Sequence, residues 1–216
     1  MLALLPVAFA LTPDSVRAAM DGLGWQDVGE RQTEVGLVAV RHLPLDGIDC
    51  LEASASTTLD LERMKTIVVD IRGNPEWSSA ALTQSQVLAE AEGTVDYLQV
   101  LDNPSPISDR YWYLRGTWGP TGEGWALSWE HFDGEAEYPK AHAELRASHQ
   151  GAVPVTFNVG SWAFLPQGSA TVARFRSCSD AGGNVPRWAG EAAARRMLPN
   201  NIIDLFKAAG DASSGR

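Results

Sequence analysis

The chain has 216 residues, of which 44% are hydrophobic and 20% charged, a balance typical of one folded domain rather than of a disordered chain. The 17 Lys and Arg residues against 27 Asp and Glu give a net charge of −10 at pH 7. Because a surface without a basic excess gains little from contact with phosphates, this charge argues against a nucleic-acid binder and against bulk attraction to an anionic membrane.

The first ten residues, MLALLPVAFA, are apolar and end in Ala8-Phe9-Ala10. That small-x-small ending is typical of a secretory signal peptide. No Lys or Arg precedes the apolar stretch, so the alternative is an apolar arm packed on the domain of a cytoplasmic protein. We expect a signal peptide over 1–10, one domain over 11–209, a flexible polar tail over 210–216, and a periplasmic or secreted protein.

Local patterns predict an alternation of helices and many strands. Thr12-Pro13-Asp14 has the cap, proline and acid of a helix start, and apolar residues follow at a spacing of three to four. Alternating or continuous apolar segments bounded by turn residues predict strands. The predicted strands cover 25–32, 35–42, 51–58, 86–91, 95–101, 110–118, 125–132, a broken stretch across 143–165, and 170–179; predicted helices cover 59–71, a short segment from Asn74, and 184–209.

This order of elements is an α+β pattern with a sheet of about nine antiparallel strands. A sheet of that width curls, and its concave face is the available partner for the apolar face of the last helix. We expect Pro199 to kink or break that helix. A helix laid across a cupped sheet leaves room for an internal cavity, which points to ligand binding.

The only cysteines are Cys50 and Cys178, and neither belongs to a Cys-x-x-Cys pair. A zinc or redox motif is therefore not indicated. In an exported protein the two could form one disulfide, and the alternative is two buried thiols.

Three segments resemble one known family. Residues 102–115 (DNPSPISDRYWYLR) resemble the segment before a strand in START domains, the steroidogenic acute regulatory protein-related lipid-transfer family. Residues 180–188 (DAGGNVPRW) and 195–206 (RRMLPNNIIDLF) resemble the segments that lead into and form that family's C-terminal helix. One departure is that Tyr111 follows Arg110 where the family usually has Asp.

The resemblance implies a helix-grip fold, in which a strongly bent antiparallel sheet grips the C-terminal helix around a tunnel for one lipid. It also places the third strand antiparallel to the last strand. Cys50 starts the one and Cys178 ends the other, so the resemblance favours a disulfide between them in an exported protein.

The resemblance further implies a set of cavity residues. Sterol-binding members carry an acid and an arginine in the cavity, and Asp96 and Arg115 look like that pair; the alternative is an ion pair on the surface. Because side chains alternate between the two faces of a strand, Tyr111 and Tyr113 would then face inward together with Arg115. The expected lipid-binding residues are Asp96, Tyr111, Tyr113, Arg115, Trp129, Phe175, Trp188 and Ala192, although core packing is an alternative for each aromatic residue.

In the family, the loop before the sixth strand lies at the tunnel mouth beside the C-terminal helix. Here that loop covers 103–109, and we expect Pro104, Pro106 and Met197 to form a gate that opens for the ligand.

Motifs for catalysis are scarce. The four histidines form no His-Glu-x-x-His motif, no Gly-x-Ser-x-Gly is present, and His142 and His149 are expected in exposed loops. We therefore expect no metal, no cofactor and no enzyme activity. The prediction is a monomeric carrier of a sterol or other lipid with transient membrane contact. One alternative is a helix-grip enzyme of the cyclase or hydrolase type, with an unpartnered acid such as Asp96 as its base; another is an interaction domain whose cavity is filled.

Overall fold

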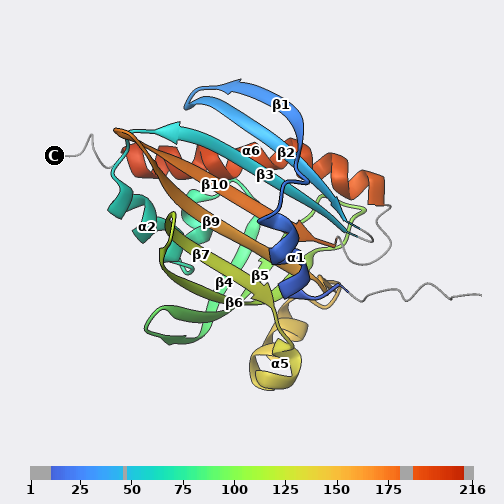
Figure 1. Ribbon diagram of the computed structural model, residues 1–216. Coiled ribbons are helices and arrows are strands. Elements are labelled where there is room, and N and C mark those ends of the chain that lie inside the picture. Colours follow the sequence, from blue (N-terminus) through green and yellow to red (C-terminus); the bar gives the residue numbers. More distant parts are fainter. Residues whose placement is uncertain (1–10, 46–47, 181–186, 212–216) are drawn as a thin grey trace, which may run out of the picture.

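A computed structural model of the protein describes residues 11–45, 48–180 and 187–211 (Figure 1). The predicted signal peptide over 1–10 lies outside the described residues, as do residues 212–216 of the predicted tail. The tail was expected to start at residue 210, whereas the last helix continues to Asp211.

The centre of the fold is a ten-stranded, almost wholly antiparallel sheet in the order β1-β2-β3-β10-β9-β7-β6-β5-β4, with short β8 parallel to β6. Its curled shape and the helix across it confirm the predicted α+β helix-grip architecture (Figure 1). The strands are β1 Gln26–Thr33, β2 Gly36–Leu45, β3 Ile48–Thr57, β4 Leu82–Ala91, β5 Thr94–Leu101, β6 Arg110–Thr121, β7 Gly124–His131, β8 Val153–Pro154, β9 Asn158–Gln167 and β10 Ala170–Ser179.

The helices lie on both faces of this sheet. The longest, α6, packs against β3, β2 and β10 on the concave face, and α1 covers the other face (Figure 1). They are α1 Pro13–Met20, α2 Leu61–Val69, α3 Asn74–Trp77, α4 Gly134–Glu137, α5 Pro139–Ser148 and α6 Arg187–Asp211. None of the helices in the described part is both long and apolar enough to cross a bilayer.

Two expectations about these elements are corrected by the structure. Residues 143–165 are not a broken strand, because α5 runs to Ser148 and only then do β8 and β9 follow. Helix α5 is polar on most of its surface and buries only Leu145, so it lacks the apolar periodicity that reveals a helix. Of the kink or break expected at Pro199, the break is absent: α6 is continuous through Pro199, and Leu198 and Ile202 on either side of it are buried in the same core.

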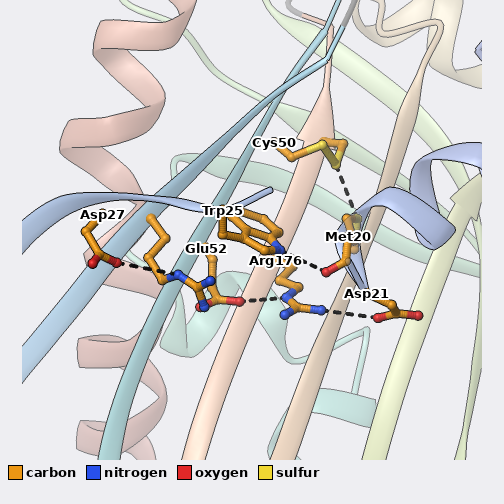
Figure 2. Close-up of polar contacts among 9 residues, drawn as sticks. Met20, Asp21, Trp25, Asp27, Cys50, Glu52 and Arg176 are labelled. Atoms are coloured by element: carbon orange, nitrogen blue, oxygen red, sulfur yellow. Dashed lines mark hydrogen bonds and ion pairs between the residues drawn. A yellow bond between two sulfur atoms is a disulfide. The ribbon is translucent and has the colours of Figure 1, made fainter. Parts of the chain in front are cut away.

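Helix α1 is fixed to the convex face by a cluster of charged residues (Figure 2). Buried Arg176 donates from Nε to Glu52 at 2.7 Å and reaches Asp21, just after α1, at 3.3 Å. The Trp25 indole donates to the Met20 carbonyl at 2.8 Å and lies beneath the Arg176 guanidinium. Because each buried charge has a partner, the cluster can hold α1 against the sheet without an uncompensated desolvation cost.

The same face contains a disulfide. Cys50 of β3 and Cys178 of β10 are direct partners in the antiparallel register, and a disulfide joins them with their Cα atoms 4.1 Å apart. The neighbouring Met20 sulfur lies 3.2 Å from the Cys178 sulfur (Figure 2). This pairing of β3 with β10 is the one that the family resemblance implies.

Candidate ligand-binding cavity

A cavity of about 480 Å³ lies between the concave face of the sheet, α3 and α6. Most of the strands from β3 to β10 line it, and so do Asn103 and Ile107 from the loop before β6. Its volume lies within the range of roughly 300–1,000 Å³ that is usual for small-molecule sites. The interior is therefore hollow, which argues against the alternative of an interaction domain with a filled cavity.

Aromatic side chains form much of the apolar lining. The Phe175 ring lies edge-on to Trp162 at 4.8 Å and tilted against Trp129 at 5.6 Å between ring centroids. Trp129 lies flat across Gly160 of the next strand, where a Cβ atom would collide with the indole. Its Nε1 donates to Asn158 at 2.9 Å. Trp129 and Phe175 thus lie where the sequence analysis expected them, on the cavity wall.

Polar side chains of the lining are mostly satisfied within the protein. Gln99 is buried, accepts from the Trp112 indole at 3.1 Å and donates to Ser85 at 3.0 Å. The charged groups among the described lining residues are Arg110, Asp180 and Asp204. Burial disfavours the ionised phenol of Tyr97, which also borders the cavity, and this raises the pKa of Tyr97 far above its usual range.

Asp96 and Arg115 pair as predicted, but they lie outside the cavity. The Arg115 guanidinium donates two hydrogen bonds of 2.7 Å to the Asp96 carboxylate and one of 2.8 Å to Glu137 of α4. Tyr138 donates to the same carboxylate at 2.9 Å. The Arg115 hydrogen bonds, opposed in part by burial, lower the pKa of Asp96. This cluster fixes α4 and the start of α5 to the sheet.

The inward orientation expected for Tyr111 and Tyr113 is also wrong. Both rings are buried on the convex face, beneath α4 and α5, in one apolar cluster with Phe132 and Leu145. The Tyr111 hydroxyl donates to Glu135 at 2.7 Å. Burial raises the pKa of Tyr113 to about 12. The cavity side of β6 is formed instead by the alternate residues Arg110, Trp112 and Leu114.

The remaining predicted site residues fall near the cavity or outside the described side chains. Met197 of α6 borders the cavity with 44% of its surface exposed. Pro104 and Pro106 belong to the same loop as the lining residues Asn103 and Ile107 but are not part of the lining. The side chains of Trp188 and Ala192 lie outside the described part of α6.

Groups for catalysis are few in the described part of the chain. It contains no cluster of His, Cys, Asp and Glu that could hold a metal ion. His142 is not in a loop: it belongs to α5, and its Nδ1 lies 3.3 Å from the Tyr113 hydroxyl. Asp96, the base considered for a cyclase or hydrolase, is paired with Arg115 and lies on the face opposite to the cavity.

Solved structures with the same architecture are numerous, whereas no protein-family model and no curated protein matches the chain. A STAR-related lipid transfer protein fragment from Xanthomonas axonopodis aligns at a TM-score of 0.66 and 16% identity, over 88% of this chain and 98% of its own. Human StAR-related lipid transfer protein 5 aligns at a TM-score of 0.72 and 15% identity, over 93% of both chains. The fold is START-like. A Streptomyces aromatase/cyclase, Zhui, aligns at a TM-score of 0.50 and 15% identity, over 77% of this chain and 94% of its own. Proteins named as enzymes therefore also share the fold.

Proposed function

We propose that this protein binds one hydrophobic molecule, a sterol or another lipid, in the cavity beneath α6 and carries it between membranes. The observation that supports the proposal is the hollow of about 480 Å³ with its aromatic and aliphatic walls. Each CH₂ group moved from water to such a site is worth about 0.8 kcal/mol. A compact lipid can thus be held at micromolar affinity after the entropic cost of association.

The cavity mouth supports a route for exchange with a membrane. Ile107 and Met197 both border the cavity, and each keeps 44% of its surface exposed. Exposed large apolar residues at the rim of an apolar site favour contact with a lipid surface. We propose that the loop over 103–109, with Pro104 and Pro106, moves away from Met197 to admit the ligand during such contact.

Export to an oxidising compartment belongs to the same proposal. Disulfides persist in the periplasm and outside cells and are rare in the cytosol. The disulfide between Cys50 and Cys178 therefore supports the signal peptide expected over 1–10.

A cavity-filling variant tests the binding proposal. Ser177 borders the cavity, and Ser177→Phe should fill part of it and weaken the binding of a fluorescent sterol, dehydroergosterol, at least ten-fold. Thr117→Phe, which adds the same ring to an exposed position of β6, is the matched control and should bind like the wild type. Equal affinity in all three proteins would show that the ligand does not enter the cavity.

A further inference from the structure

Asp204 is an unusual residue for an apolar cavity. It lies on α6, is 9% exposed and borders the hollow. Its Oδ2 accepts from the Ser79 backbone N–H at 2.7 Å. Among the described residues, this is the carboxylate's one hydrogen bond, and no Lys, Arg or His forms an ion pair with it. Burying a carboxylate with one donor is costly unless something else satisfies it.

Helix α3, which packs against α6, contains two polar groups that are buried and unsatisfied. The indole N–H of Trp77 is buried and donates to no described atom, and Trp77 is only two residues from Ser79. The side-chain oxygen of Asn74 is likewise buried and accepts no hydrogen bond. Both residues border the cavity. Unsatisfied buried polar groups are rare in folded proteins, and two of them on the helix that packs against α6 indicate a missing polar partner.

The charge of the lining limits what this partner can be. Arg110 is the one cation against Asp180 and Asp204 among the described lining residues, and its Nη1 already donates to the backbone of Ser108 and Asp109. A carboxylate or phosphate placed beside Asp204 would be repelled. A hydroxyl, in contrast, can donate to Asp204 and accept from an indole N–H with the same oxygen.

We infer that Asp204, together with Trp77 on the helix that packs against α6, selects ligands that end in an uncharged hydroxyl and rejects ligands that end in an anion. This inference rests on the proposed function, since it needs a hydrophobic ligand in the cavity. It assigns the polar end of that ligand to the contact between α3 and α6, rather than to the Asp96–Arg115 pair on the opposite face.

The test uses three ligands that differ only at the end group: lauryl alcohol, laurate and laurylamine. Their affinities for the delipidated full chain are measured at neutral pH from the emission of the lining tryptophans and confirmed by calorimetry. The alcohol should bind at least ten-fold more tightly than laurate. Asp204→Asn keeps the size and an acceptor but removes the charge, so the preference for alcohol over laurate should fall to three-fold or less. Asp27→Asn, at a side chain that is 91% exposed, is the charge-matched control and should keep the preference.

Each outcome bears on a definite claim. Equal binding of alcohol and laurate by the wild type, or an unchanged preference in Asp204→Asn, would overturn the inference and leave the carrier function standing. Tightest binding of laurylamine would also overturn it, because Asp204 would then be a cation site. Binding of none of the three, nor of dehydroergosterol, would remove the proposed function itself.

Discussion

The two ends of the concave face are built from similar residues but differ in what fills them. At one end, Trp125 stacks on Phe164 at 5.7 Å, and the Lys65 ammonium group of α2 lies over the Trp125 ring at 5.8 Å. At the other end, Trp129, Trp162 and Phe175 leave the cavity open beneath the same helix. Aromatic content alone thus does not decide whether an interior is solid. The difference is that Phe164 is fully buried away from the cavity, whereas Phe175 borders it.

The largest expected effect on stability comes from truncating one aromatic ring at each end of the concave face. Phe164→Ala removes a fully buried ring from the packed end and should cost about 3–5 kcal/mol of unfolding free energy. Phe175→Ala removes a ring that already borders a void, so it should cost about 1–3 kcal/mol because fewer contacts are lost. Urea denaturation of the delipidated proteins measures both. A larger loss for Phe175→Ala would contradict the assignment of solid and hollow ends.

Loss of the disulfide should lower the stability of the protein without changing the packing at either end of the concave face. Cys50 and Cys178 are 128 residues apart, and replacing both by Ala should cost about 2–5 kcal/mol in the free energy of unfolding. Since the bond lies on the convex face, the affinity for dehydroergosterol should stay within two-fold of wild type at a temperature where both proteins are folded. A large loss of affinity in the folded variant would show that the convex face supports the cavity.

The smallest effect concerns the convex cluster at Asp96. Its pKa is lowered in the folded protein, so the carboxylate contributes stability above its unfolded pKa of about 3.9, and this contribution is lost as the pH falls through the folded value. Asp96→Asn should therefore cost about 1 kcal/mol of unfolding free energy at neutral pH, and this cost should shrink as the pH falls through the folded pKa of Asp96. Ligand affinity should not change at either pH where the protein is folded. A drop in affinity at neutral pH would place this pair in the binding site after all.

Most of the element order could be predicted from the sequence because caps, turns and alternation are local signals, whereas the pairing of β3 with β10 was implied by the family resemblance. The Thr12 cap is an example, since its side chain accepts from the Ser15 N–H as the Thr-Pro-Asp pattern indicates. Polar α5 could not be predicted, because most of its stabilising contacts come from residues distant in the chain, such as Tyr113 beside His142.

The orientation of β6 could not be predicted for a different reason. Alternation separates Tyr111, Tyr113 and Arg115 from Trp112 and Leu114, but it does not tell which set faces the concave side. Each set contains buried aromatic or aliphatic residues, because Tyr111 and Tyr113 pack beneath α4 and α5 on the convex face. The pairing of Asp96 with Arg115 could therefore be predicted from the sequence. The sequence did not reveal that this pair lies on the convex face of the sheet. Asp204 has no signal of its own in the sequence, since an acid on an amphipathic helix normally faces water.

The most direct measurement is native mass spectrometry of the purified chain, followed by solvent extraction of whatever it carries. The account predicts one hydrophobic molecule per chain for the wild type, its loss in Ser177→Phe and its retention in Thr117→Phe. A wild-type protein that is free of ligand, and that takes up neither sterols nor phospholipids from vesicles, would contradict it.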